Sequence, residues 1–318
     1  MRRIVRSELF HGGRKKKDFF EGWYFKLVSA DKTNSIALIP GISKVGDVED
    51  SHSFVQVLRE TDETHYIRFE TADFSWSDNP FNVRVANSSF DLGKISVDVH
   101  SEKLDLSGEI HFSCLHRWPS TIFSPGAMGW FSYVPFMQCY HGILSMDHEL
   151  SGSLCIQGKV IDFTGGRGYI EKDWGRSFPS AWIWMQTNHF SVPGTSLTLS
   201  IATVPWLGRP FTGMIGGFLH DGVLERFTTY TGAKIDELEA MDDTVRIRLK
   251  KKDLTLLIEA QRRDGGILKS PLMGSMSGRI KESLSAEIKV QFMHEDKVVF
   301  DGVGTNAGLE VVSAANGL

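Results

Sequence analysis

Apolar and polar residues alternate with a period of two along most of this chain, which predicts a protein built almost entirely of β-strands. The alternating or β-branched runs are short, and Gly, Asp, Asn or Ser residues bound them. They predict strands over residues 22–28, 35–40, 53–58, 65–69, 95–100, 104–112, 244–250, 254–260 and 287–292. The clearest helical period is confined to residues 233–241, so the fold class is all-β.

A weak internal repeat suggests how these strands are organised. Residues 22–27 are followed after a turn by 35–41, and residues 181–186 are followed in the same way by 197–205. If each pair opens one barrel, the chain forms two tandem lipocalin-like antiparallel β-barrels, since small barrels leave no exposed edge and can hold one ligand. We expect one barrel over 1–160, including an aromatic crossover segment, and the other over 161–318.

The crossover, residues 119–152, is unusually rich in aromatic residues and Met for a linker. It is interpreted as a plug, lid or wall of a pocket, or as a packed crossover beneath the first barrel.

The strand beginning at residue 181 mixes large aromatics with amides on one face. A period of two places Trp182, Trp184, Gln186 and Asn188 together, with the side chains between them on the other face. This face predicts a pocket for a mostly apolar ligand with a polar end. The alternative is that the tryptophans are core residues and the amides satisfy buried backbone groups.

Composition narrows the choice of partners. The 318 residues carry a net charge of only -4 and form no basic stripe, which excludes a nucleic-acid surface. The isolated cluster 14–17 is either a solvated loop or a contact with an anionic membrane surface. With no secretory signal and no apolar run of 18 residues, a cytoplasmic location is expected, at most peripheral to a membrane.

The same survey predicts no metal and no cofactor. The three cysteines and eleven histidines lack ligand spacing, and no glycine loop leads into a helix to cradle phosphates. Reduced thiols in a cytosolic protein are the expectation for the cysteines.

Several segments together resemble the tocopherol cyclase family. The most specific is Gly168-Tyr169-Ile170-Glu171-Lys172-Asp173-Trp174-Gly175, which is rich in rare residues. The others are residues 20–26, 39–42, 52–57, 129–131, 135–137, 139–142, 145–148, 178–179, 182–190 and 304–311. The resemblance implies a lipocalin-related double barrel and a cofactor-free ring closure of prenylated hydroquinols to chromanols. Carotenoid hydratases look like distant relatives.

Such a ring closure needs an acid in a dry pocket, because an alkene must be protonated while a phenolic oxygen attacks. Desolvation keeps a carboxylic acid protonated at neutral pH. Asp173 is the preferred acid, beside the apolar Trp174; Glu171 and Glu21 are the other candidates. The alternative reading of residues 171–173 is a turn with a surface salt bridge.

The remaining candidates would bind the substrate. Trp23, Trp182 and Trp184 could hold the prenyl chain and stabilise positive charge through their ring faces. Tyr24, His141, Gln186 and Asn188 could hold the phenolic oxygens, and His141 could equally be structural. Against the enzyme stand two other hypotheses: a carrier for a hydrophobic isoprenoid quinone or pigment, and a β-structured interaction module without a cavity.

Overall fold

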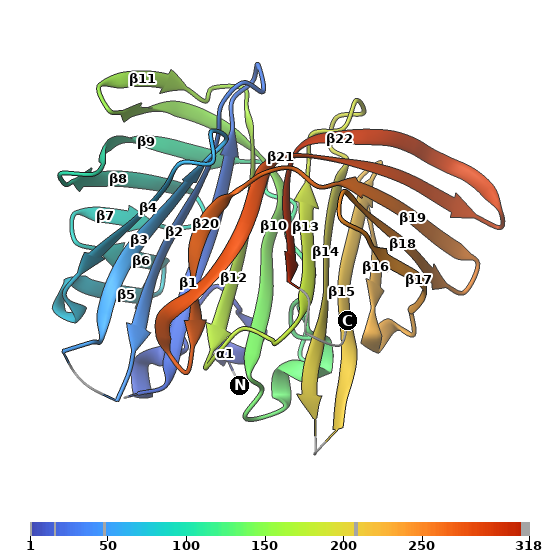
Figure 1. Ribbon diagram of the computed structural model, residues 1–318, viewed down its shortest axis with the longest axis horizontal. Coiled ribbons are helices and arrows are strands. Elements are labelled where there is room, and N and C mark those ends of the chain that lie inside the picture. Colours follow the sequence, from blue (N-terminus) through green and yellow to red (C-terminus); the bar gives the residue numbers. More distant parts are fainter. Residues whose placement is uncertain (1, 16, 47–48, 207–208, 313–318) are drawn as a thin grey trace. The chain divides into compact units, whose positions relative to one another are not determined.

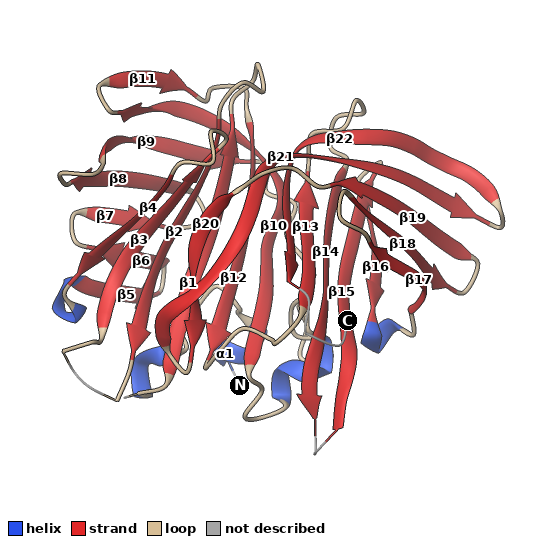
Figure 2. Ribbon diagram, viewed as in Figure 1, coloured by secondary structure: helices blue, strands red, loops and turns tan. Residues whose placement is uncertain are grey.

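The computed structural model describes residues 2–15, 17–46, 49–206 and 209–312, and antiparallel strands dominate it (Figure 2). The helices are one turn or little more: α1 (Arg2–Val5), η1 (Gly12–Arg14), η2 (Thr71–Asp73), η3 (Gly129–Tyr133) and η4 (Thr229–Thr231). Within these ranges no helix is long and apolar enough to cross a membrane. The all-β prediction is confirmed.

The chain divides into two compact units, and the first is discontinuous. It comprises Met1–Phe178 and Ile267–Ile280, while the second comprises Pro179–Gly266 and Lys281–Leu318. The expected division at 160/161 differs from this. A cut there would remove β12 (Arg167–Gly175) from β1 (Phe19–Val28) and β10 (Cys139–Ile156), between which it is hydrogen-bonded (Figure 1).

The sheet of the first unit runs in the order β4-β3-β2-β1-β12-β10-β9-β8-β7-β6-β5, with β11 paired to β10. The remaining bounds are β2 (Ser35–Lys44), β3 (His52–Arg59), β4 (Thr64–Phe69), β5 (Phe74–Asp78), β6 (Phe81–Val85), β7 (Ser88–Phe90), β8 (Lys94–His100), β9 (Asp105–Ser113) and β11 (Lys159–Asp162). The sheet curls, so that β6 lies close to β2 and β3. Its inner face holds a core of aliphatic and aromatic side chains that includes Trp23, Phe25, Ile170 and Trp174.

The second sheet has the order β16-β15-β14-β13-β22-β21-β19-β18-β17, with β20 paired to β21; β20 after Gly266 and β21 up to Ile280 belong to the first unit. The bounds are β13 (Trp182–Thr187), β14 (Ser196–Trp206), β15 (Arg209–His220), β16 (Val223–Thr228), β17 (Lys234–Ala240), β18 (Thr244–Lys251), β19 (Leu254–Gln261), β20 (Gly266–Leu272), β21 (Ser275–His294) and β22 (Lys297–Val312). Its separate core includes Ile183, Met185 and Phe218.

The two sheets share one scheme of connection. In each, an opening strand pairs with the strand after it on one side and with the last strand of the unit on the other: β1 with β2 and β12, β13 with β14 and β22. The two predicted opening hairpins are therefore confirmed.

Closure of the barrels is the part of the fold prediction that the structure corrects. Among the described residues, no ladder joins the edge strands β4 and β5, or β16 and β17. In each unit a short 3-10 turn, η2 or η4, connects these two edges instead.

All nine predicted strands are confirmed, and the short helical period at residues 233–241 does not correspond to a helix. Residues 234–240 form strand β17 at a sheet edge, where Asp236 and Glu237 pair with Lys250 and Arg248 of the neighbouring strand. In the crossover, the half after Cys139 is part of β10.

Candidate active site on strand β12

Strand β12 carries the densest chemistry of the chain, and it divides that chemistry between its two faces. Ile170 and Trp174 belong to the core of the first unit. Since successive side chains alternate, Lys172 points inward with them, while Glu171 and Asp173 leave the sheet on the opposite face. The alternative of a surface turn at residues 171–173 is thus wrong.

The outer face joins two carboxylates through a histidine. His141 on β10 is the register partner of Asp173, and its Nδ1 lies 2.9 Å from Asp173 Oδ1. Its Nε2 lies 3.6 Å from Glu171 Oε2. The hydroxyl of Tyr169 donates a hydrogen bond of 2.6 Å to the same Glu171 oxygen. Tyr24 is the register partner of Glu171 on β1, so its side chain is on this face too.

Electrostatics favour the charged histidine. Burial lowers the pKa of His141, but the charges of Asp173 and Glu171 and the hydrogen bond to Asp173 outweigh it and raise the pKa to about 9. The imidazole therefore carries a proton at neutral pH. Glu171 is only 5% exposed, whereas the Asp173 side chain is 25% exposed.

The inner face holds a different cluster, built around a buried ion pair. Lys172 Nζ lies 2.5 Å from Glu21 Oε1, and both side chains are fully buried. Lys172 also donates to the carbonyl oxygens of Ser7 and Leu9. The Glu21 carboxylate accepts the backbone N–H groups of His11 and Gly12, each at 2.9 Å.

In the Glu21–Lys172 pair, each charge stabilises the charged form of the other. Burial would raise the pKa of Glu21, but Lys172 and His11 lower it overall. Burial lowers the pKa of Lys172 to about 8 despite the attraction of Glu21. Glu21 is therefore an ionised anchor for the N-terminal segment.

Trp23, which was predicted to share a face with Glu21, and Trp174, which was predicted beside Asp173, both lie on the inner face. Trp23 Nε1 donates to the Glu8 carbonyl oxygen at 3.0 Å, and the Trp174 ring stacks on His11 with centroids 4.3 Å apart. The sheet thus separates Glu21, Trp23 and Trp174 from the cluster of Glu171, Asp173 and His141.

The other predicted binding residues belong to the second unit. Trp182, Trp184 and Gln186 on β13 share the face opposite its core residues, as the sequence pattern predicts, and Asn188 follows the strand end. Trp182 Nε1 donates to Glu310 Oε2 at 2.6 Å. Glu310 is the register partner of both Trp184 and Glu282, and both glutamates are buried.

Sequence reasoning missed Glu282 and Glu310, as well as the anchoring roles of Lys172 and His11. Only the pairing of β22 with β13 and β21 brings the two glutamates beside the tryptophans. Tyr169 could have been found, because it stands two residues before Glu171 on the same face.

The outer-face cluster also has the composition of a metal site. One ligand atom each from His141, Glu171 and Asp173 lies within 4.8 Å of the others, and exposed Asp253, His294 and Glu295 form a second such group. A metal needs the neutral imidazole, so it would have to displace the proton that both carboxylates hold on His141. The cluster fits a stored proton better than a cation.

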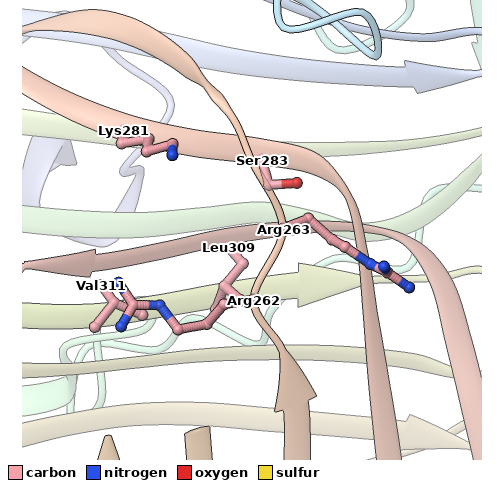
Figure 3. A pocket seen from close by; sticks show the side chains of 6 residues that line it. All are labelled: Arg262, Arg263, Lys281, Ser283, Leu309 and Val311. Atoms are coloured by element: carbon pink, nitrogen blue, oxygen red, sulfur yellow. The ribbon is translucent and has the colours of Figure 1, made fainter. Parts of the chain in front are cut away.

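A shallow pocket in the second unit contains none of the predicted residues. Arg262, Arg263, Lys281, Ser283, Leu309 and Val311 line it (Figure 3). The two arginine side chains point to opposite sides of it, and Lys281 pairs with Asp264 at 2.8 Å, so its cations do not converge on one ligand position.

Two all-β units, the first with a carboxylate–histidine cluster across the neighbouring strands β10 and β12, define the class of this protein. Residues 86–313 match the tocopherol cyclase-like family, which is most of the chain, and the protein belongs to that family. The match includes His141 and the whole of β12, so it confirms the resemblance carried by residues 168–175.

Curated relatives are distant and longer. The chain is 23% identical over 194 residues to a probable chloroplastic tocopherol cyclase of Oryza sativa subsp. japonica; this match covers 58% of the chain and 41% of the relative. The chain thus spans less than half the length of that relative.

Solved structures support the fold. The crystal structure of CghA matches with a TM-score of 0.59 at 9% identity, over 92% of this chain and 88% of that one. Kievitone hydratase from Nectria haematococca matches with a TM-score of 0.51 at 11% identity, over 95% and 93%.

Proposed function

We propose that this protein is a cofactor-free cyclase that closes a chromanol-type ring on a prenylated hydroquinol, with Glu171 as the acid. The observation that carries the proposal is the cluster of Tyr169, Glu171, His141 and Asp173, in which a buried carboxyl group lies beside a proton-bearing imidazole. Membership of the tocopherol cyclase-like family supports the reaction class.

Glu171 suits the acid role better than Asp173, the preference from sequence. The Asp173 side chain is 25% exposed to solvent and is bound to His141 Nδ1 at 2.9 Å, so it lies in a wetter environment. Glu171 is more deeply buried, and an apolar substrate that excludes water from it would favour its protonated form. His141 Nε2, 3.6 Å away, is the source of that proton.

The reaction balances as an isomerisation. Glu171 transfers its proton to the less substituted alkene carbon, the C=C π bond breaks, and a tertiary cation forms. The phenolic oxygen attacks this cation, the C–O bond closes the ring, and the phenolic proton returns to the Glu171–His141 pair. Asp173 holds the imidazole in orientation, and no oxidant or second reactant enters.

Trp182 and Trp184 stay predictions for binding the prenyl chain. The predictions for holding the phenolic oxygens stay with Tyr24, His141, Gln186 and Asn188.

The experiment is incubation of the full chain with a panel of prenylated hydroquinols, in water and in D₂O. We expect a product with the mass of the substrate and the ultraviolet spectrum of a chromanol, which gains one carbon-bound deuterium in D₂O. Glu171→Gln should keep ligand binding and lose about 10²–10⁴-fold in turnover, the usual value of general acid catalysis. Glu149→Gln, an exposed glutamate on β10, is the matched control and should stay active.

The other hypotheses give different results. A product heavier by one water would identify a hydratase, and tight binding without conversion would identify a carrier. Loss of turnover in Asp173→Asn with an active Glu171→Gln would return the acid role to Asp173. If neither substitution changed turnover, the buried-acid mechanism would be wrong.

A further inference from the structure

The crossover between β9 and β10 exposes large apolar side chains. Phe123 is 85% exposed and Phe136 is 95% exposed, and Ile122, Trp130 and Tyr133 are exposed as well. Five such residues within fifteen positions exceed the isolated apolar side chains that are normal on a protein surface, and they mark an interaction site. We call them the crossover patch.

Local bonds hold the backbone of this patch in place. The Tyr133 hydroxyl donates to the Ile122 carbonyl oxygen at 2.5 Å, and the Ser132 hydroxyl donates to that of Pro125 at 3.0 Å. The Tyr140 hydroxyl holds the Val134 carbonyl at 2.7 Å. The phenylalanines therefore point to solvent from an ordered support.

The charge around the patch is positive. The chain has no Asp or Glu from 115 to 146, and residues 1–17 hold seven Lys or Arg against one Glu, on a molecule with a net charge of -4. Arg3 pairs with Asp78 and Arg6 with Glu8, each at 2.8 Å, which leaves the basic run after Gly13 as the main source of positive charge. The two segments touch: the Ser120 hydroxyl donates to the Val5 carbonyl at 2.6 Å, and Arg117 lies 3.7 Å from Glu8. His11, which precedes η1, contacts the Arg3 carbonyl oxygen of α1 through its Nε2 at 3.1 Å, so η1 lies close to α1.

We propose that the crossover patch and the basic N-terminal segment form a docking surface for an anionic lipid bilayer. Exposed Phe, Trp and Tyr side chains enter the interface between head groups and acyl chains, and Lys and Arg beside them meet anionic head groups. A second copy of the chain is a poorer partner, because a symmetric contact would bring two basic surfaces together. This inference goes beyond the proposed reaction and does not depend on it.

The test is vesicle flotation of the full chain with phosphatidylcholine alone and with phosphatidylcholine mixed with phosphatidylglycerol. We expect binding to the mixed vesicles that weakens with salt. The double variant Phe123→Ser/Phe136→Ser should bind about tenfold or more weakly, since it removes two buried aromatic groups from the lipid. Lys15→Glu/Lys17→Glu should weaken binding to the mixed vesicles only.

The control is Val298→Ser/Val299→Ser, which removes two exposed apolar side chains from the start of β22. It should bind like the wild type. Circular dichroism of all variants verifies the fold. Failure of the wild type to bind either vesicle would overturn the proposal, and so would equal loss in the control. A wild-type dimer that Phe123→Ser/Phe136→Ser converts to a monomer, without vesicle binding, would identify a self-association surface instead.

Discussion

Glu171 and Lys172 are adjacent in sequence, yet they take part in two separate charge clusters. A strand sends neighbouring side chains to opposite faces, so Glu171 meets His141 and Tyr169 while Lys172 meets Glu21. One short motif therefore supplies both a candidate proton donor and a structural anchor.

At this scale the clearest prediction concerns Asp173→Asn. The change removes the charge nearest to His141, so the pKa of His141 should fall from about 9 toward or below its ordinary 6.5. A proton that must reside on His141 for ring closure is lost as pH rises through that pKa, and the alkaline limit of activity should move to lower pH. A pH–rate profile and an NMR titration of the imidazole measure both shifts. An unchanged alkaline limit would show that His141 is not the proton reservoir.

The sequence pattern predicts some residues of the candidate site but not how they are arranged. The period of two correctly placed Glu171 with Asp173, and Trp182 with Trp184. It could not place His141 against Asp173, because that contact depends on the register between β10 and β12, which shifts after Ile143. It also grouped Glu21 with the acids, because alternation alone does not tell which face of a strand is the core.

At the scale of elements, β12 and β1 hold the N-terminal segment through a few buried polar groups. Residues 7–12 contribute backbone carbonyls to Lys172 and N–H groups to Glu21. No hydrophobic period marks this segment, so its place could not be predicted. Residues 233–241 show the opposite case: they have a short helical period, but residues 234–240 form a strand because they pair with β18.

Glu21→Gln should destabilise the protein by about 3–5 kcal/mol, because it leaves Lys172 buried without its carboxylate. Urea unfolding followed by tryptophan fluorescence measures the loss, and hydrogen exchange at residues 7–12 should rise. The double variant Glu21→Leu/Lys172→Met should regain much of the stability, since it removes both charges. A Glu21→Gln protein with wild-type stability but no turnover would instead restore Glu21 as a catalytic candidate.

At the scale of the molecule, the first unit needs a piece of chain from far along the sequence. The N–H of Lys269 donates to Gln56 Oε1 at 2.8 Å, the Ser43 hydroxyl donates to the Gly274 carbonyl at 2.7 Å, and the N–H of Met273 donates to the Ser177 hydroxyl at 2.7 Å. The repeated hairpins predicted two barrels that follow one another in sequence. That division does not include the return of Ile267–Ile280 to the first unit.

A fragment of residues 1–178 should therefore be incomplete. Each missing hydrogen bond is worth about 1 kcal/mol, and buried apolar contacts add to it. We expect the fragment to melt at a lower temperature than the intact chain, and a peptide of residues 266–281 to raise its melting temperature in a concentration-dependent way. A scrambled peptide is the control. A fragment that melts cooperatively and ignores the peptide would show that the returning segment is dispensable.

The discontinuity of the first unit also constrains how the chain is made. Synthesis proceeds from the N-terminus, and domains usually fold as they emerge from the ribosome. Here Ile267–Ile280 is translated after most strands of the second unit, β13 to β19. Until then, the contacts that this segment makes with β2, β3 and Ser177 cannot form, although strands of the second sheet are already available. The last folding step of the first unit therefore comes late and competes with the folding of the second unit.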